Sequence, residues 1–138
     1  MIQNLDFAPT FLDYAGITPS EDLQGISFKN IVNQKETKWR DAIYYTYYEY
    51  PSVHMVKRHY GVRTERYKLM HFYYDIDEWE LYDLKEDPSE MKNVYNNPKY
   101  KKIKEDLHLK LKELREEYGD SDSLDLMHIK RYVSKINK

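Results

Sequence analysis

The chain contains no cysteine among its 138 residues. It therefore has no disulfide framework, no thiolate metal site and no cysteine nucleophile. Its charges nearly cancel, with a formal net charge of −2, so the chain as a whole is not drawn to nucleic acid or to an anionic membrane surface. No apolar run approaches the roughly 20 residues that a membrane-spanning helix needs. We therefore expect neither nucleic acid nor a membrane as a partner.

Glycine and proline are also scarce, with 4 and 5 residues, whereas tyrosine is abundant, with 15. The four glycines are isolated from one another, which excludes a glycine-rich phosphate loop. Buried tyrosine rings need a hydrogen-bond partner for the hydroxyl, so a core built from them has a polar edge. The first residues show no basic segment followed by an apolar run, the pattern of a signal peptide. The length fits one domain, or one domain with a small appendage.

Residues 2–16 have the pattern of an amphipathic helix. Its apolar face is formed by Ile2, Leu5, Leu12 and Ala15. We expect Asp6 to cap the helix and Gly16 to end it in a left-handed conformation. Residues 23–32 predict a further turn of helix, and residues 33–38 read as a polar linker. One small helix cannot bury its apolar face alone, so we expect it to pack on a partner.

From Trp39 onward the pattern changes to short strands. Residues 42–50 are aromatic and β-branched and stop at Pro51, which predicts a strand. Three further runs predict a hairpin that turns near Glu65-Arg66 and a following strand: 60–64, 67–73 and 79–84.

A long amphipathic helix is predicted after Pro98. Its apolar residues step by three and four along one face: Tyr100, Ile103, Leu107, Leu111, Leu114 and Tyr118. Gly119 ends this helix, and the polar tail beyond it holds enough apolar residues for a last docked segment. Together the elements predict an α+β fold, in which a four-stranded antiparallel sheet carries the long C-terminal helix on one face.

The five histidines are too scattered to predict a metal site. We interpret His71 as a structural residue of a strand and His108 as solvated on the polar side of the long helix. His54 and His59 differ, because they bracket a loop that also carries Arg58. An arginine side chain matches the oxygens of sulfate or carboxylate. The loop is therefore either solvated, as charged loops usually are, or a surface for an anionic ligand.

A series of short motifs, in one order and spacing, resembles the C-terminal part of the sulfatase family. The most telling are Gly61-Val62-Arg63-Thr64, Tyr67-Lys68-Leu69, Glu80-Leu81-Tyr82-Asp83-Leu84 and Asp87-Pro88 with Glu90. Further matching positions are Asp6, Ala8-Pro9-Thr10, Leu12-Asp13, Ala15-Gly16-Ile17, Gly25, Ser27, Trp39-Arg40 and Asn93. The resemblance covers nearly the whole chain up to about the long helix.

The resemblance implies two parts. Residues 1–36 would be the last helix and linker of an otherwise absent α/β catalytic domain, and residues 37–138 the C-terminal subdomain. Family catalysis uses a formylglycine made from the Cys or Ser of a C/S-x-P-x-R motif, which this chain lacks. The chain is thus expected to hold no catalytic residue, metal ligand or cofactor, since calcium and formylglycine belong to the missing domain. A complete sulfatase of this type would be periplasmic or secreted.

The segment from Glu49 to Tyr60 is most similar to that of sulfatases acting on glucosamine 6-sulfate in glycosaminoglycans. In the family this subdomain borders the active-site cleft, which makes His54 the first candidate substrate contact, followed by His59 and Arg58. The expected partners are the chain's own catalytic domain and a sulfated saccharide. The hypothesis is a C-terminal sulfatase fragment that completes the fold and one wall of the cleft and is inactive alone. The alternatives are a stand-alone Tyr-rich module for anionic saccharides, or a protein-interaction fragment.

Overall fold

The computed structural model describes residues 1–35, 38–51 and 54–136, and the chain splits into two units. Unit 1 comprises Met1–Asp41 and unit 2 comprises Ala42–Lys138. Each unit has its own architecture and its own means of stabilisation.

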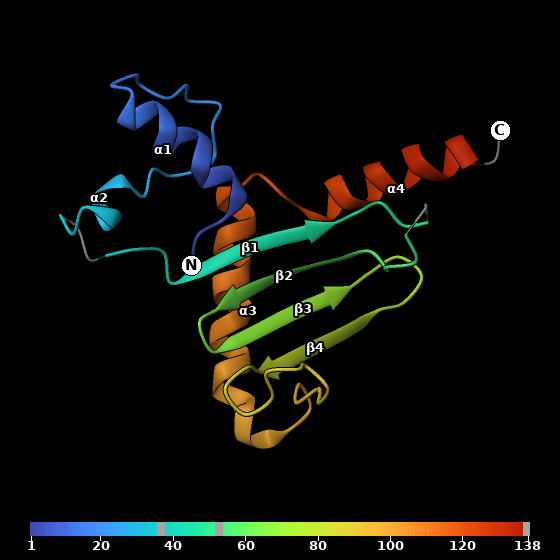
Figure 1. Cartoon of the computed structure of the whole chain (residues 1–138). Helices are drawn as coiled ribbons and strands as arrows, with labels where there is room; N and C mark the ends of the chain where they lie inside the picture. Colours follow the sequence, from blue (N-terminus) through green and yellow to red (C-terminus); the bar gives the residue numbers. More distant parts are fainter. Residues whose placement is uncertain (36–37, 52–53, 137–138) are drawn as a thin grey trace. The chain divides into compact units, whose positions relative to one another are not determined.

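Unit 1 is built from three short helical segments: η1 (Asn4–Asp6), α1 (Phe7–Tyr14) and α2 (Lys29–Val32) (Figure 1). The helix predicted over residues 2–16 thus begins as a 3₁₀ turn. Gly16 has a φ of +72° and ends the helix as predicted. The Ile17 N–H then donates to the Leu12 carbonyl at 2.9 Å. Of the turn predicted over residues 23–32, only α2 is helical.

The carboxylate of Asp6 does not cap α1, so that prediction was wrong. Its Oδ1 accepts from Arg40 Nη2 at 2.7 Å and from the Ile26 N–H at 3.0 Å. Its Oδ2 accepts from Arg40 Nη1 and from the Gln3 N–H, both at 2.7 Å. A fully buried carboxylate needs such partners, because an unpaired charge is costly away from water. Two of the partners, Ile26 and Arg40, lie 20 and 34 residues away, so a local capping pattern does not reveal them.

These hydrogen bonds keep Asp6 ionised. Burial by itself raises the pKa of Asp6, but the hydrogen bonds from Arg40 and the two N–H groups outweigh it and hold the pKa below 3.8. The geometry depends on Gly25, where a Cβ would lie 2.0 Å from the Leu5 carbonyl oxygen. Only glycine allows this approach, which brings the neighbouring Ile26 N–H to Asp6.

The apolar side chains of unit 1 are largely exposed. Phe7 packs edge-on against Phe28, with ring centroids 5.4 Å apart, yet it remains 46% exposed. Phe11 is 67% exposed and Tyr14 51%. This agrees with the expectation that the first helix cannot bury its apolar face alone.

Unit 2 contains the predicted four-stranded antiparallel sheet, in the order β1-β2-β3-β4 (Figure 1). Its strands are β1 (Ala42–Tyr47), β2 (His59–Thr64), β3 (Tyr67–Phe72) and β4 (Glu78–Asp83). The hairpin turns at Glu65-Arg66, as predicted, and the Leu84 N–H donates to the Arg66 carbonyl at 2.7 Å. The first strand is shorter than predicted, because regular pairing ends at Tyr47.

Helix α3 (Lys101–Glu117), entered through η2 (Pro98–Tyr100), lies across one face of the sheet (Figure 1). The core between them is formed by Ala42, Tyr60, Val62, Leu69, Leu81, Val94, Leu107 and Leu111. Leu107 and Leu111 come from the predicted apolar stripe, and Gly119, with a φ of +67°, ends the helix region. The α+β fold class is therefore confirmed.

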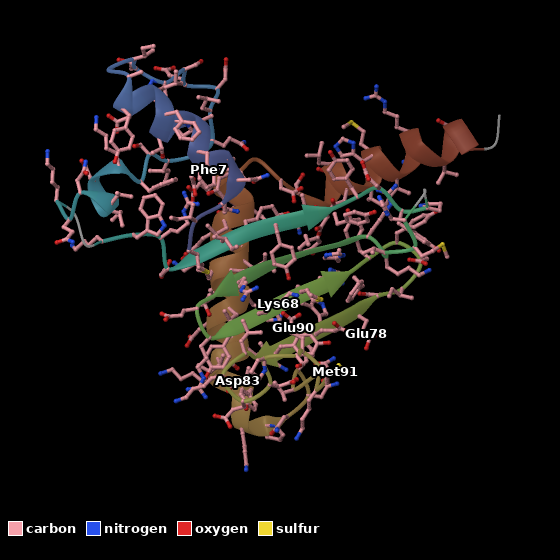
Figure 2. All side chains as sticks on the ribbon, viewed as in Figure 1. Phe7, Lys68, Glu78, Asp83, Glu90 and Met91 are labelled. Atoms are coloured by element: carbon pink, nitrogen blue, oxygen red, sulfur yellow. The ribbon has the colours of Figure 1, made fainter. Side chains whose placement is uncertain are left out.

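Charged side chains along the sheet pair with residues distant in the sequence. Arg66 donates to both carboxylate oxygens of Asp83, at 2.9 and 2.8 Å, and Asp83 is only 2% exposed. Lys68 pairs with Glu90 on the face opposite α3, where Figure 2 shows the two side chains together. The first pair ties the β2–β3 turn to β4, and the second ties β3 to the segment that leads into α3.

The polar tail forms a further helix, α4 (Asp122–Ile136). It starts three residues after Gly119 and runs past the end of the sheet at which β1 finishes (Figure 1). Within the described ranges, no helix combines the length and the apolar character needed to cross a bilayer.

Candidate functional site

The two loops at one end of the sheet form the candidate site. Tyr47 pairs with His59, His59 with Phe72, and Phe72 with Glu78, so these four residues share one end of their strands. The β1–β2 loop and the β3–β4 loop both leave the sheet there. We call this region the loop end of the sheet.

Lys57 ties the two loops together. Its Nζ donates to Asp75 in the β3–β4 loop and, at 2.7 Å, to the Tyr50 hydroxyl. It also lies 4.1 Å from the centre of the Tyr50 ring, a cation–π distance. The hydrogen bond with Asp75 raises the pKa of Lys57 and lowers that of Asp75, so both stay charged at neutral pH.

Arg58 lies beneath these loops and is only 1% exposed. Its Nε donates to the Tyr50 carbonyl oxygen, and its guanidinium carbon lies 5.7 Å from the centre of the Tyr74 ring. Its carbonyl accepts from the Tyr73 N–H at 3.1 Å. The guanidinium predicted to contact substrate thus supports both loops from inside.

His59 is half-buried in an aromatic cluster on the sheet face opposite α3. Its ring stacks on Tyr47 with centroids 5.7 Å apart and packs against Phe72 at 5.3 Å. Its Nδ1 lies 2.8 Å from the Lys57 carbonyl oxygen, so as the N–H form it donates there. The second predicted histidine therefore helps to fix the base of the loop.

His54 is the exposed member of the predicted trio, in a stretch where Met55 and Val56 are also exposed. The structure therefore separates the three residues by depth. His54 faces solvent, His59 is half-buried and Arg58 lies inside. Their role in binding substrate stays a prediction.

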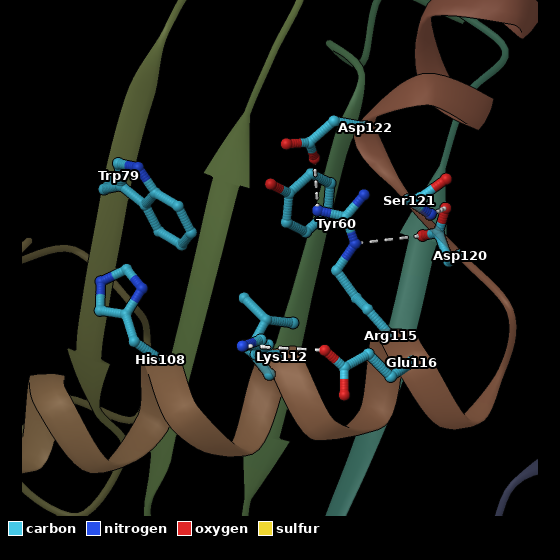
Figure 3. A pocket seen from close by; sticks show the side chains of 10 residues that line it. Tyr60, Trp79, His108, Lys112, Arg115, Glu116, Asp120, Ser121 and Asp122 are labelled. Atoms are coloured by element: carbon cyan, nitrogen blue, oxygen red, sulfur yellow. Dashed lines mark hydrogen bonds and ion pairs between the residues drawn. The ribbon is translucent and has the colours of Figure 1, made fainter.

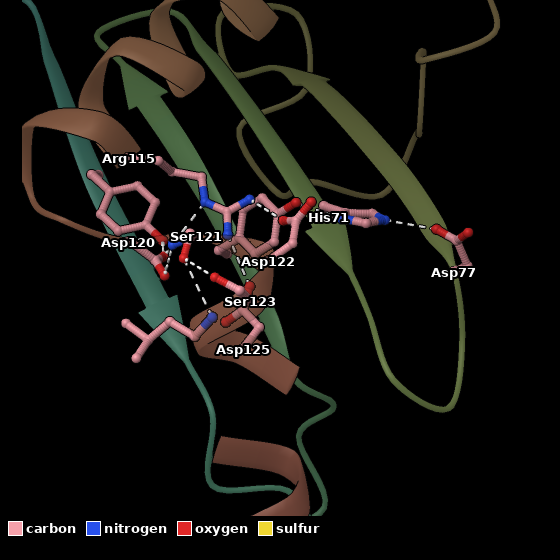
Figure 4. Close-up of polar contacts among 11 residues, drawn as sticks. His71, Asp77, Arg115, Asp120, Ser121, Asp122, Ser123 and Asp125 are labelled. Atoms are coloured by element: carbon pink, nitrogen blue, oxygen red, sulfur yellow. Dashed lines mark hydrogen bonds and ion pairs between the residues drawn. The ribbon is translucent and has the colours of Figure 1, made fainter. Parts of the chain in front are cut away.

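A cluster not foreseen from the sequence lies between α3 and α4. The Arg115 guanidinium donates to Asp122 at 2.7 Å and to Asp125 at 2.9 Å, and its Nε lies 3.6 Å from Asp120 (Figures 3 and 4). Its guanidinium carbon sits 3.9 Å from the centre of the Tyr60 ring. In the sequence, this cluster could have been recognised from the run of aspartates that follows Gly119, about one helical turn after Arg115.

Three carboxylates surround this one guanidinium. Burial opposes its charge, but the hydrogen bond to Asp122 and the neighbouring negative charges raise the pKa of Arg115 overall. Burial and the repulsion of Asp120 raise the pKa of Asp125. Burial also raises the pKa of Tyr60 to about 12, against the favourable field of Arg115. Arg115 therefore joins α3 to α4 through Asp122 and Asp125 and contacts the sheet through Tyr60.

His71 belongs to a stacked aromatic band. Its ring lies flat on Trp79, with centroids 4.2 Å apart, its Nδ1 is 2.9 Å from the Tyr60 hydroxyl, and its Nε2 is 2.7 Å from Asp77. Figure 4 shows the contact with Asp77. The interpretation of His71 as a structural residue agrees with these contacts.

His108 also joins this band, which the helix pattern missed. It packs 4.4 Å from Trp79, and its Nε2 lies 3.1 Å from the Tyr95 hydroxyl (Figure 3). Burial, followed by the charge of Lys104, lowers its pKa. The prediction of a solvated His108 was wrong, because the wide Trp79 ring reaches beyond the leucine stripe of α3.

In residues 1–35, 38–51 and 54–136, no group of three or more His, Asp or Glu side chains is placed to hold a metal ion. The polar clusters of the loop end bring their own cations, Lys57 and Arg115, to their carboxylates. Their chemistry is that of ion pairing and hydrogen bonding.

Comparison with known proteins assigns a family to the chain. The family model described as "N-sulphoglucosamine sulphohydrolase, C-terminal" matches residues 1–117. An N-acetylglucosamine-6-O-sulfatase of Bacteroides thetaiotaomicron is 52% identical over 122 residues, which cover 86% of this chain and 22% of the relative. An arylsulfatase of Clostridium perfringens is 33% identical over 123 residues, covering 86% of this chain and 24% of the relative.

A solved structure extends this similarity to three dimensions. A protein in complex with its substrate, D-glucosamine-2-N,6-O-disulfate, is 51% identical and superposes with a TM-score of 0.80, covering 85% of this chain and 24% of that chain. The chain thus spans between a fifth and a quarter of the length of these relatives.

Proposed function

Because the chain belongs to the N-sulphoglucosamine sulphohydrolase C-terminal family, we propose that it is the C-terminal subdomain of an enzyme that hydrolyses sulfate esters of glycans. The observation that carries this proposal is the 52% identity, over 86% of the chain, to a sulfatase named for an amino sugar. In this role the chain completes the fold of the enzyme and forms one wall of the substrate cleft.

The reactive groups would come from the catalytic domain. Sulfatases generally use calcium and a formylglycine there. The residues of this chain do not fit either group, since it lacks the C/S-x-P-x-R motif and its described part has no group of three or more metal-ligating side chains. The chain's own contribution is therefore to bind, to orient and to support.

Unit 1 is proposed to dock on that catalytic domain. Phe7, Phe11 and Tyr14 leave large apolar surfaces exposed on one short helix, while the Asp6–Arg40 pair fixes the backbone around it. An ordered helix with an uncovered apolar face is typical of a segment whose partner lies outside the unit.

His54 is proposed to contact the substrate at the rim of the cleft, because it is the exposed residue of the predicted trio. Arg58 and His59 hold the loop that carries it, through the Tyr50 and Lys57 carbonyl oxygens. In the full-length enzyme, His54→Ala should raise KM about tenfold, a loss of about 1.4 kcal/mol in binding, with the unfolding transition unchanged. Steady-state kinetics on a 6-sulfated amino sugar check this, and kinetics equal to the parent enzyme would remove His54 from the site.

Split complementation tests the proposal as a whole. The 138-residue chain is expressed together with the catalytic domain of the Bacteroides relative, and release of sulfate from 6-sulfated N-acetylglucosamine is measured. We expect the two parts to co-purify and to hydrolyse the ester, whereas this chain alone gives no turnover. Turnover by this chain alone, or no complex with the catalytic domain, would contradict the proposal.

Two matched substitutions locate the docking surface. Phe11→Asp in unit 1 should abolish complex formation, whereas Leu109→Asp on α3 should not, although the two side chains are similarly exposed, at 67% and 63%. Equal effects of both substitutions would contradict docking through unit 1.

A further inference from the structure

A cleft of about 740 Å³ lies in unit 2 between the β3–β4 loop and α4. This volume falls within the range of small-molecule sites in proteins. Its lining is mostly apolar, with three tyrosines and one isoleucine from the sheet and the loop on one side and aliphatic side chains from α4 on the other: Tyr60, Tyr73, Tyr74, Ile76, Leu126 and Ile129.

The family match does not account for this cleft. The match ends at residue 117, whereas α4, which forms one wall, begins at Asp122. That wall is held in place by Arg115, through its hydrogen bonds to Asp122 and Asp125. Stacking of Tyr48 on His128, with centroids 5.7 Å apart, ties α4 to the β1–β2 loop as well.

Tyr74 presents its ring at this cleft in an unfavourable backbone conformation. Its φ is +91°, a region that is unfavourable for a residue with a side chain. The ring is nevertheless 46% exposed, with the Arg58 guanidinium 5.7 Å from its centre. The fold thus keeps an accessible aromatic surface where glycine would be more stable.

The polar lining of the cleft is dominated by carboxylates. Asp75, Asp77, Asp122 and Asp125 line it, against the single ammonium group of Lys130. Asp77 and Asp122 are 88% and 84% exposed, so they stand at the rim. Carboxylates accept strong hydrogen bonds from hydroxyl groups, but they repel a sulfate group.

Three of these carboxylates already have cationic partners, and the fourth, Asp77, has a histidine partner. Arg115 contacts Asp122 and Asp125, and Lys57 contacts Asp75, while the His71 ring lies within hydrogen-bond distance of Oδ1 of Asp77. Neighbouring lysine and arginine side chains thus already neutralise much of the negative charge of these carboxylates. Their oxygens remain suitable acceptors for hydroxyl groups, beside aromatic and aliphatic walls on which the C–H face of a sugar ring can pack.

We propose that this cleft binds an uncharged sugar residue of the glycan, separate from the sulfated residue that is hydrolysed. The inference rests on the proposed function and deepens it. It implies that the enzyme prefers chains in which sulfated and unsulfated residues are both present.

The test is a direct binding measurement on the 138-residue chain, without hydrolysis. The chain is titrated by NMR with the unsulfated disaccharide of N-acetylglucosamine, with its 6-O-sulfated form and with glucosamine as a cationic probe. We expect saturable shifts at residues of the cleft, with the unsulfated disaccharide binding at least tenfold more tightly than either other probe. No saturable binding, or equal or tighter binding of the sulfated or cationic probe, would overturn the proposal.

Tyr74→Gly separates binding from folding. It removes the ring and relieves the positive φ, so the chain should unfold at the same or a higher denaturant concentration while its affinity falls at least tenfold. The matched control is Tyr14→Ala in unit 1, which removes a ring of similar exposure, 51%, and should leave affinity unchanged. Retained affinity in Tyr74→Gly, or an equal loss in Tyr14→Ala, would overturn the proposal. Because no sulfate is released in this assay, its outcome is independent of the complementation experiment.

Discussion

The two units of this chain are stabilised by opposite means. Unit 2 buries an apolar core in which Val62, Leu69 and Leu81 have no exposed surface. Unit 1 instead buries the Asp6 carboxylate, which pairs with Arg40, and leaves Phe7 and Phe11 exposed. Burial of apolar surface is the main source of folding free energy, so unit 2 has the composition of an independently folding unit. Unit 1 has a defined shape but little apolar core, as expected of a segment that completes another domain.

The largest effect is expected from Asp6→Ala. It leaves the Arg40 guanidinium, whose side chain is only 12% exposed, without its carboxylate. Breaking such a pair typically costs about 4 kcal/mol, which is enough to unfold unit 1. Trp39 lies in unit 1 and Trp79 in unit 2, so in a Trp79→Phe background the fluorescence reports on unit 1 alone. The control is Asp13→Ala, which removes a partly exposed ion pair with Lys29 and should change little.

The same carboxylate makes unit 1 sensitive to acid. The folded-state pKa of Asp6 is held below 3.8, so its contribution to stability is present above that pH and is lost as the pH falls through the lower, folded-state value. The Trp39 signal should therefore report unfolding of unit 1 in acid. If the acid transition of Asp6→Asn matched that of the parent chain, another group would be responsible.

Leu81→Ala should instead destabilise unit 2 and leave the stability of unit 1 unchanged. Removing a fully buried leucine from the β-sheet core costs about 3 kcal/mol. Urea unfolding followed through Trp79, which packs against this core, should shift to lower denaturant, while the Trp39 transition stays where it was. A simultaneous shift of both transitions would show that the two units unfold together.

The smallest effect is expected from alanine substitutions at two comparable glycines, one in each unit. Gly16 in unit 1 and Gly119 in unit 2 both end helices with positive φ, +72° and +67°, and a Cβ at either would meet nothing within 4 Å. Alanine at each site should therefore cost about the same, roughly 1 kcal/mol, from backbone conformation alone. Thermal unfolding of both variants checks this, and a larger loss at Gly16 would reveal packing around the α1 end.

Local patterns predicted most of the fold. The alternation of strand residues, the Glu65-Arg66 turn and the three-and-four spacing of Leu107 and Leu111 are each contained within a few residues. Elements specified in this way have correct positions within one or two residues, apart from the first strand. They account for the sheet and for the helix that covers it.

The polar sites could not be predicted in the same way, because their partners lie far apart in the chain. Asp6 meets Arg40 34 residues away, and Arg58 is buried by loops whose approach no local pattern encodes. His108 was wrongly predicted to be solvated, because it packs against Trp79, which belongs to a strand distant in the sequence. For the candidate site, sequence reasoning identified the loop but not the depth at which each of its residues lies.

Gly25 has no charge, no side chain and no place in the loop end of the sheet, yet it controls the electrostatics of unit 1. A methyl group there would collide with the Leu5 backbone and push the Ile26 N–H away from the carboxylate it serves. A substitution at residue 25 should therefore mimic the loss of an ion pair through steric displacement alone. The acid sensitivity of this unit therefore depends partly on the absence of a Cβ atom at residue 25.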